Sequence, residues 1–313
     1  MLTKIPLEWD SPTPDSPLEQ GSVSLLNYLL EEVYDDYEPA EFSTHLSRII
    51  AWLNNVESER EQQLLLALLL DTFYAGRREF QTLYRATFRN SIVRWLINQH
   101  QLDPFSENLE DTLVSLTNAS WICPISDSLR INSFLKTTGL QSKDIRPDWR
   151  SLAELGDTTK ISDYVQKAKI RNLILLEDFV GSGTQALRAL QFAKSELNGL
   201  SILLAPMIVC PDGHRTLSEF ATNTPNVTYC PTLLVPSSEL LTRSISEPPT
   251  EMEQFVLSMR QKLNLSKDED CFGYKQTGAK VVLFSNCPNN TLPIFHAESD
   301  SWKPLFPRVE RQP

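Results

Sequence analysis

The sequence predicts an α/β protein in which helices flank a parallel sheet and an α-helical region precedes that sheet. From about residue 119 onward, short continuous apolar runs alternate with amphipathic stretches, as strands and helices do along a parallel sheet. Residues 24–99 instead repeat their apolar side chains at helical spacing. One apolar run also leads into two acids and a glycine-rich loop, and open α/β sheets bind their ligands at such strand ends.

The first 22 residues predict an extended acidic arm. Residues 1–42 hold ten acids and a single base, Lys4, so most of the net charge of −11 belongs to this end of the sequence. Such an arm either docks on a basic partner or remains a solvated, partly disordered lead-in, and the sequence leaves both interpretations open. A helical region over 23–115 and an α/β domain with a C-terminal strap over 116–313 are expected to follow.

Apolar stripes in the helical region predict helices over 24–33, 42–53, 58–70 and 79–97. The last of these brings Arg78, Arg85 and Arg89 to one face. These arginines suit nucleic acid or an acidic partner, and they equally suit an ordinary solvated helix face.

Continuous apolar runs in the α/β domain predict strands over 119–125, 173–176, 202–210, 227–235 and 279–285, of which the fourth is interrupted by Pro231. Helices are expected between them, over 129–136, 185–197, 215–221 and 251–263. Consecutive parallel strands then require right-handed crossovers.

The cysteines exclude two kinds of site. No Cys-x-x-Cys pair or Cys/His cluster occurs among the five, so neither a zinc site nor a disulfide framework is supported (Cys123, Cys210, Cys230, Cys271 and Cys287). The longest apolar run, 64–70, is too short to span a bilayer, and no signal-peptide pattern is present. A cytoplasmic protein without a membrane partner is expected.

The stretch RNLILLEDFVGSGTQ, residues 171–185, has the order strand, acidic pair, small-residue loop and helix. Gly181 and Gly183 let backbone N–H groups approach an anion without an intervening Cβ atom. The helix that begins near Thr184 adds N–H groups and the positive end of its dipole. Ser182 and Thr184 add hydroxyl donors, so this loop predicts a phosphate site.

The two acids before the loop require a different partner, because carboxylates repel a phosphate. Glu177 and Asp178 are therefore expected to face ribose hydroxyls or a magnesium ion. A P-loop is excluded because no Gly-Lys-Ser/Thr follows, and a dinucleotide fingerprint fits poorly because the acids precede only two glycines. An ordinary strand–turn–helix with an exposed acidic pair remains the plain alternative.

The segment LILLEDFVGSGT resembles, without gaps, the phosphoribosyl pyrophosphate motif of type I phosphoribosyltransferases in its shorter, orotate-enzyme-like form. The resemblance implies a type I phosphoribosyltransferase-like fold. It implies that Glu177 and Asp178 contact the ribose hydroxyls as catalytic residues, and that residues 181–184 wrap the 5-phosphate. It further implies Mg²⁺, with Asp178 as a ligand, and phosphoribosyl pyrophosphate or a nucleotide as the bound molecule.

A second strand end carries candidate residues for the pyrophosphate or the substrate. Ser126, Asp127 and Ser128, with Arg130 after them, follow the first predicted strand. Their hydroxyls and the arginine suit an anion, but Asp127 opposes one, and Ser or Asp at this point also caps helices. The basic residue usual in a pyrophosphate loop is not evident. His214, after the strand 202–210, either reaches a substrate or lies exposed in a turn.

A third group follows the last predicted strand. Asn289, Asn290 and Thr291 are expected where side chains of a parallel sheet approach a ligand, and they suit a base or a sugar. The alternative is an Asx turn followed by an aromatic–proline strap over the core.

The tail SNCPNNTLP, the downstream W-x-PLFPR and the EDFVGSGTQ loop together resemble the phosphoribosyltransferase-like proteins of prokaryotic conflict systems, over about residues 42–308. Some of these proteins are encoded beside retron reverse transcriptases and winged-helix proteins in anti-phage loci. The resemblance implies a reverse transcriptase with its nucleic acid, and a winged-helix protein, as partners.

Three functions are compatible with these features. The first is an effector or accessory protein of a retron-type defence system with phosphoribosyltransferase chemistry at the anomeric carbon. The second is a catalytically inactive nucleotide sensor, or a scaffold that binds a reverse transcriptase or nucleic acid. A metabolic salvage phosphoribosyltransferase is the third, and the long helical N-terminal region and the atypical tail argue against it.

Overall fold

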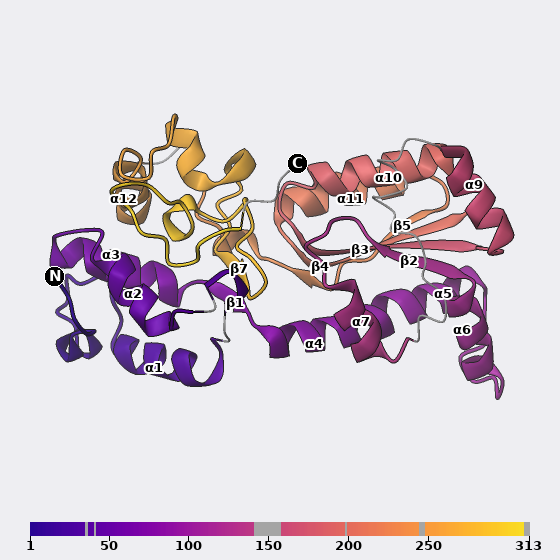
Figure 1. Ribbon diagram of the computed structural model, residues 1–313, viewed down its shortest axis with the longest axis horizontal. Coiled ribbons are helices and arrows are strands. Elements are labelled where there is room, and N and C mark those ends of the chain that lie inside the picture. The colour runs from indigo at the N-terminus through magenta and orange to yellow at the C-terminus, as the bar shows by residue number, and fades with distance from the viewer. Residues whose placement is uncertain (35–36, 41, 141–157, 198, 244–247, 310–313) are drawn as a thin grey trace. The chain divides into compact units, whose positions relative to one another are not determined.

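The computed structural model describes residues 1–34, 37–40, 42–140, 158–197, 199–243 and 248–309. The chain divides into two compact units (Figure 1). Unit 1 combines Met1–Glu79 with Ser237–Pro313, and unit 2 is Phe80–Pro236. Unit 2 is thus inserted, in sequence, into unit 1. The division of the sequence into the segments 1–22, 23–115 and 116–313 stays a prediction. The two compact units have different boundaries from these segments.

Unit 2 contains the predicted parallel sheet flanked by helices. Its strands are β2 (Ser120–Pro124), β3 (Asn172–Val180), β4 (Ser201–Val209), β5 (Val227–Tyr229) and β6 (Leu233–Leu234). The order is β2-β3-β4-β5, and β6 pairs with the later part of β4. All pairs are parallel, and the register places Leu175 opposite both Cys123 and Leu204. The α/β fold class is confirmed.

The central strands carry the continuous apolar runs 173–176 and 202–209 because helices cover both faces of the sheet (Figure 1). On one side lie α9 (Thr158–Lys167), α10 (Thr184–Glu196) and α11 (Pro211–Thr222), and on the other lie α5 (Arg94–Gln99), α6 (Leu109–Asn118) and α7 (Ile131–Thr138). Alternate residues of β3 and β4, such as Leu173 and Ile202, pack in one core with Leu190 of α10 and Leu217 of α11. This core fixes the strand ends.

Two strands differ from their predicted extent. β3 continues through the acidic pair to Val180, rather than ending at residue 176, because it remains paired with β4 as far as Val209. The run 227–235 is split into β5 and β6. Cys230 and Thr232 still donate their backbone N–H groups to β4, but Pro231 between them has no N–H to donate.

The helix predicted over 79–97 consists of three consecutive segments: α4 (Arg77–Ala86), a π-helical stretch (Thr87–Val93) and α5. Trp95 of α5 donates from Nε1 to Thr228 Oγ1 of β5, at 3.1 Å. Thr87 of the π-helical stretch lies with its Oγ1 2.7 Å from Thr232 Oγ1. Arg85, Arg89 and Arg94 are exposed. The π-helical turns lie where this helix contacts the sheet.

Unit 1 contains α1 (Ser22–Glu32), α2 (His45–Leu53), α3 (Glu59–Leu70) and α12 (Glu251–Ser258). It also contains a two-stranded parallel sheet of β1 (Phe73–Ala75) and β7 (Val281–Leu283), with Tyr74 opposite Val282. The expectation that 279–285 is a strand of the large sheet is therefore wrong. Its partner β1 has three residues, too few to show a periodicity in the sequence.

The C-terminal strap closes the core of unit 1. Trp302 and Phe306 are buried there, and Trp302 and Trp52 of α2 both donate from Nε1 to the carbonyl of Ile294, at 3.1 and 2.8 Å. Arg48 donates from Nε to the Leu305 carbonyl, at 3.1 Å. The aromatic residues of the tail thus serve to cover the core.

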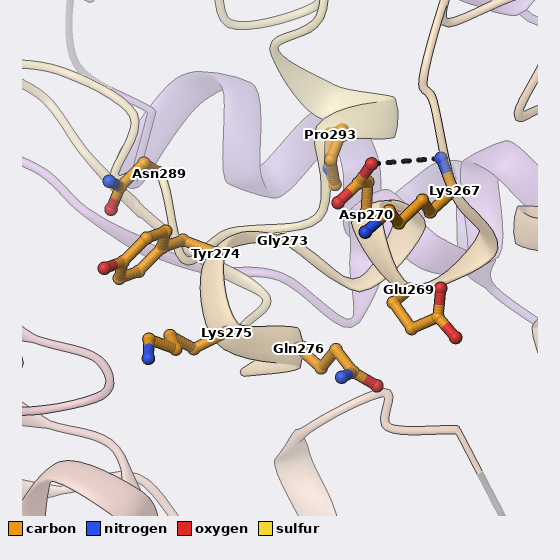
Figure 2. Close-up of a pocket in the computed structure, with 9 residues that line it drawn as sticks. All are labelled: Lys267, Glu269, Asp270, Gly273, Tyr274, Lys275, Gln276, Asn289 and Pro293. Atoms are coloured by element: carbon orange, nitrogen blue, oxygen red, sulfur yellow. Dashed lines mark hydrogen bonds between the residues drawn. The ribbon is translucent and has the colours of Figure 1, made fainter.

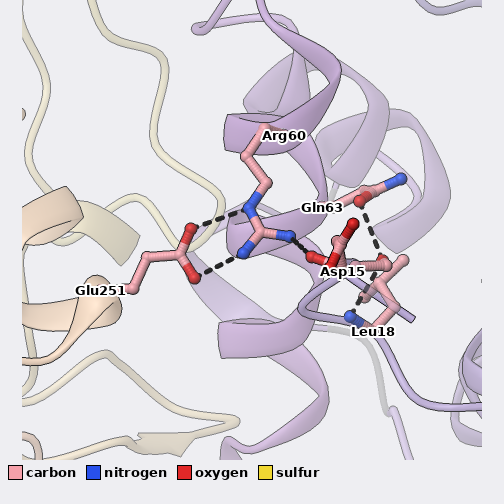
Figure 3. A network of polar contacts seen from close by, with 6 residues as sticks. Asp15, Leu18, Arg60, Gln63 and Glu251 are labelled. Carbon is pink, nitrogen blue, oxygen red and sulfur yellow. Dashed lines mark hydrogen bonds and ion pairs between the residues drawn. The ribbon is translucent and has the colours of Figure 1, made fainter. Parts of the chain in front are cut away.

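The acidic N-terminal segment packs on α3 of its own unit. Trp9 is 1% exposed and donates from Nε1 to Glu59 Oε1, at 2.9 Å. Arg60 of α3 donates to the Asp15 carbonyl and forms an ion pair with Glu251 of α12, at 2.5 Å (Figure 3). The described part of this segment thus packs against α3, and docking of the acidic arm on a basic partner stays a prediction.

Among the described residues, no helix is both long and apolar enough to cross a membrane.

Candidate functional site

The loop between β3 and α10 consists of Gly181, Ser182 and Gly183. Gly183 has a φ of +78°, a conformation that side chains disfavour. A Cβ atom on Gly183 would lie 3.1 Å from the Cα atom of Gly213 and 3.3 Å from its carbonyl oxygen. Both the backbone conformation and the close approach therefore require glycine at this position.

Gly213, in the first turn of α11, is a site residue that the sequence analysis missed. A Cβ atom on it would lie 2.6 Å from the Gly181 carbonyl oxygen and 2.7 Å from Val180 Cγ1. Its N–H donates to the same Gly181 oxygen, at 3.0 Å. A glycine inside a helix is intrinsically unfavourable, and this was the signal available in the sequence PDGH. Two helix beginnings thus meet at one loop.

The polar groups of the loop are hydroxyls and backbone N–H groups. Ser182 Oγ and Thr184 Oγ1 are 3.1 Å apart, and both side chains are half-buried. The first N–H groups of the 13-residue helix α10 have no acceptor within the helix. They carry the positive end of its dipole. The four predicted phosphate-binding residues, 181–184, therefore lie together, and their hydroxyl and backbone N–H groups form a small cluster of hydrogen-bond donors.

The acidic pair is buried just before this loop. Glu177 is 5% exposed and accepts from the backbone N–H and the Oγ of Ser126, at 3.1 and 2.6 Å. Asp178 is 3% exposed, and its Oδ1 accepts from Ser128 Oγ at 2.9 Å and from the Phe179 N–H at 2.8 Å. The strand end of β2 and that of β3 are thus joined through their polar side chains.

The helix-cap interpretation of the segment after β2 does not fit the beginning of α7, whereas the substrate interpretation stays a prediction. Helix α7 begins at Ile131, with Arg130 at its N-cap, and no side chain caps it. Ser126 and Ser128 therefore act on the acids rather than as helix caps. Asp127 and Arg130 are exposed on the same segment. The predicted helix start at residue 129 is two residues early.

His214 lies in α11, next to Gly213 in sequence. Its Nδ1 is 3.2 Å from the hydroxyl of Tyr229 at the end of β5, and burial raises the pKa of that phenol. Cys210 at the N-cap of α11 has its pKa raised to about 12 by burial and by the charge of Asp212, so it stays a thiol. His214 is half-buried, which rules out the fully exposed turn that the sequence allowed.

The third predicted group belongs to unit 1, whereas the β3 loop belongs to unit 2. Asn290 and Thr291 are buried. Asn290 Nδ2 donates to Thr277 Oγ1 at 2.8 Å, and Thr291 Oγ1 donates to the Val281 carbonyl. The expectation that these residues follow a strand of the large sheet is wrong, because β7 pairs with β1. Asn289 is exposed.

The acidic pair is compatible with Mg²⁺ but forms no complete metal site. The described residues contain no group of three or more His, Cys, Asp or Glu side chains that could hold an ion. Magnesium commonly takes one or two protein carboxylates together with oxygens of the substrate and water. A carboxylate has about four acceptor positions, and Asp178 accepts from Ser128 and from the Phe179 N–H through one of its oxygens, Oδ1.

Comparison with known proteins identifies the family. No match was found among curated proteins or among solved structures. Residues 49–308 match the PRTase-CE family, and this range includes both the β3 loop and the C-terminal strap. The chain therefore belongs to the PRTase-CE family of phosphoribosyltransferase-like domains of conflict systems.

Proposed function

We propose that this protein binds a phosphorylated ribose between the 181–184 loop and the acidic pair of β3. The observation that carries the proposal is the close contact of Gly183 with Gly213. This contact fixes the loop so that backbone N–H groups and two hydroxyls lie together at the beginning of α10. The 5-phosphate accepts from these donors. The ribose hydroxyls donate to Asp178, while Glu177 holds the segment after β2 in place through Ser126.

The same arrangement supports phosphoribosyl transfer. In that reaction the bond from the anomeric carbon to pyrophosphate breaks, pyrophosphate leaves with the electron pair, and a nucleophile that gives up a proton takes its place. Positive charge develops on the ribose, and the buried carboxylates beside it stabilise that charge. Mg²⁺, when bound with Asp178 as a ligand, supplies charge neutralisation for the pyrophosphate. Arg130 is the cation nearest in sequence to Ser126 and Ser128.

A non-catalytic sensor or scaffold is the second candidate, and one observation favours it. The segment in the place of a pyrophosphate loop uses the hydroxyls of Ser126 and Ser128 on the protein's own acids. This supports ribose phosphate binding more strongly than it supports transfer. In a retron-type defence system, the partners would be a reverse transcriptase with its nucleic acid and a winged-helix protein. The exposed Arg85, Arg89 and Arg94 suit the phosphates of such a nucleic acid.

Calorimetric titration with ribose 5-phosphate, and with phosphoribosyl pyrophosphate and Mg²⁺, tests binding. We expect Gly183→Val to abolish both interactions. Gly139→Val is the matched control, because Gly139 has a similar φ of +73° but open space around it. Asp178→Asn retains an acceptor for Ser128 and is expected to weaken ribose binding about 10- to 100-fold, as loss of a hydrogen bond to a charged group does. The melting temperature of Asp178→Asn should change little.

Release of pyrophosphate separates the two candidates. Phosphoribosyl pyrophosphate, Mg²⁺ and a mixture of nucleobases are incubated with the protein, and free pyrophosphate is measured. Release that disappears in Gly183→Val supports transfer, and binding without release supports the sensor. Equal ribose 5-phosphate binding by Gly183→Val and Gly139→Val would show that the loop is not the site.

A further inference from the structure

A strained loop in unit 1 is not among the residues assigned to the ribose phosphate site. It covers residues 273–278. Gly273, Lys275 and Gln276 have φ values of +76°, +57° and +55°. Glycine accepts such values easily, but they are unfavourable for the side chains of lysine and glutamine. Strain of this kind collects at binding sites, where the surrounding structure enforces it.

The loop is held rigidly by hydrogen bonds. Asn290 Nδ2 donates to the Tyr274 carbonyl at 3.1 Å and to Thr277 Oγ1 at 2.8 Å. The Tyr274 N–H donates to the Asn289 carbonyl at 2.9 Å. A Cβ atom on Gly273 would lie 2.6 Å from the Asn290 carbonyl oxygen, so the two segments touch through their backbones. This explains why Asn290 is buried, and it makes the loop a fixed platform.

The platform displays its side chains beside a cavity. Tyr274 is 46% exposed, and Lys275 and Gln276 are exposed as well. These three line a cavity of about 610 Å³ together with Asn289 and Lys267 (Figure 2). In Figure 2, Tyr274 lies between Asn289 and Lys275. The volume is that of a site for a small organic ligand.

The charges around the cavity favour an anion. Glu269 pairs with Arg243, at 3.7 Å, and the carboxylate of Asp270 accepts from the Lys267 backbone N–H, at 3.0 Å. Asp268, beside them in sequence, pairs with Arg260, at 3.2 Å. Within the described part of the chain, the ammonium groups of Lys267 and Lys275 form no ion pair. Glu269 and Asp268 are thus paired with arginines, whereas Lys267 and Lys275 keep their charge for a ligand.

We propose that this cavity binds a nucleotide, independently of the ribose phosphate site in unit 2. The base stacks on the exposed ring of Tyr274, as bases do on aromatic side chains of single-strand-binding proteins. The amides of Asn289 and Gln276 contact the polar edge of the base. The phosphate contacts the ammonium groups of Lys275 and Lys267. A free mononucleotide and an unpaired nucleotide of a single strand share this chemistry.

The test is calorimetric titration of the full chain with AMP and with CMP, in saturating ribose 5-phosphate so that the β3 loop is filled. We expect binding, and we expect Tyr274→Ala to weaken it about tenfold. Tyr28→Ala is the matched control, since Tyr28 is also in unit 1 and is 58% exposed. No heat with either nucleotide, or equal affinity in Tyr274→Ala and Tyr28→Ala, would overturn the proposal.

Lys275→Gly distinguishes a ligand site from a merely structural turn. Glycine relieves the strain at a φ of +57° while removing the ammonium group. We expect weaker AMP binding together with an unchanged or higher melting temperature, and unchanged binding would contradict the assignment. Titration with a ten-residue oligothymidine then shows whether the natural ligand is a free nucleotide or part of a single strand. Tyr274-dependent binding tighter than that of the mononucleotides assigns a single strand, and binding no tighter than theirs assigns a free nucleotide.

The proposals for the two sites can be contradicted separately. Gly183→Val should lose ribose 5-phosphate binding and keep AMP binding at Tyr274. AMP binding that disappears in Gly183→Val and persists in Tyr274→Ala would assign the nucleotide to the β3 loop and overturn the second site alone.

Discussion

Glu177 and Asp178 are neighbours on β3, but two different serines hold them. Ser126 binds Glu177 through both its backbone and its hydroxyl, whereas Ser128 binds one oxygen of Asp178. The sequence indicated the acids and their ligand chemistry. It did not reveal that both serines would donate hydrogen bonds to the acids, because a contact between residues about 50 positions apart leaves no local pattern. Gly213 was missed because the helix was predicted to begin only at residue 215, which left this glycine in a turn, where glycine is common.

Two histidines of unit 1, the buried His45 and the half-buried His296, make its stability depend on pH. Burial and the charge of Arg48 lower the pKa of His45 to about 3, and burial and Arg308 lower that of His296 to about 4. In the unfolded chain both titrate near 6.5. Below pH 6.5 the unfolded state therefore binds protons that the folded state does not, so stability is lost as the pH falls toward 4.

Denaturant titration between pH 7 and 4 measures this effect. The free energy of unfolding of unit 1 should fall by up to about 1.4 kcal/mol per pH unit for each histidine. His45→Phe keeps the stacking on Tyr34, whose ring centroid is 5.2 Å away, and removes one titrating group. The slope should then be about halved. An unchanged slope in His45→Phe would show that His45 is accessible to protons in the folded state.

At the scale of elements, the beginning of α11 is part of the β3 loop. Gly213→Ala places a Cβ atom against the Gly181 carbonyl oxygen and Val180. Such overpacking costs about 1–3 kcal/mol of stability, and it displaces the donors of the loop. We expect a lower melting temperature and weaker ribose 5-phosphate binding, measured by thermal unfolding and calorimetry. Glu219→Ala, on an exposed face of α11, should leave both unchanged.

Elements with a strong local pattern were predictable from the sequence, and those defined by distant partners were not. The apolar runs of β2 and β4 and the stripe of α10 appear close to their predicted bounds, whereas β3 begins near its predicted start and extends four residues further. The three residues of β1 form a strand only because β7 lies beside them. The polar tail residues Asn290 and Thr291 looked like ligand contacts, because the backbone carbonyls that they bind, those of Tyr274 and Val281, are distant in the sequence.

At the scale of the whole molecule, the two units have separate cores. Trp9, Trp52 and Trp302 are buried in unit 1, and the core of unit 2 lies between its sheet and α9–α11. Calorimetric unfolding should therefore show two transitions. Ribose 5-phosphate should raise only the transition of unit 2, because a ligand stabilises the folded state that binds it.

Trp9→Ala tests the N-terminal contact with α3 in the same experiment. It should lower the free energy of unfolding of unit 1 by about 3–5 kcal/mol and leave the transition of unit 2 in place. Leu7→Ala is the control, since Leu7 is 71% exposed. A shift of both transitions by Trp9→Ala would mean that the units unfold as one.

The insertion of unit 2 within unit 1 also sets an order of events at the ribosome. Unit 2 is a continuous segment, so all of its strands have been synthesised before Ser237–Pro313 exists. At roughly 5–20 residues per second, the ribosome takes on the order of 10 s to add that last segment. During this interval the nascent chain already contains the β3 loop. The residues that cover α2 and β1, which include Phe295 and strand β7, have not yet been synthesised. Until this last segment is added, the N-terminal part of unit 1 is therefore the part of the nascent chain that exposes apolar surface to chaperones.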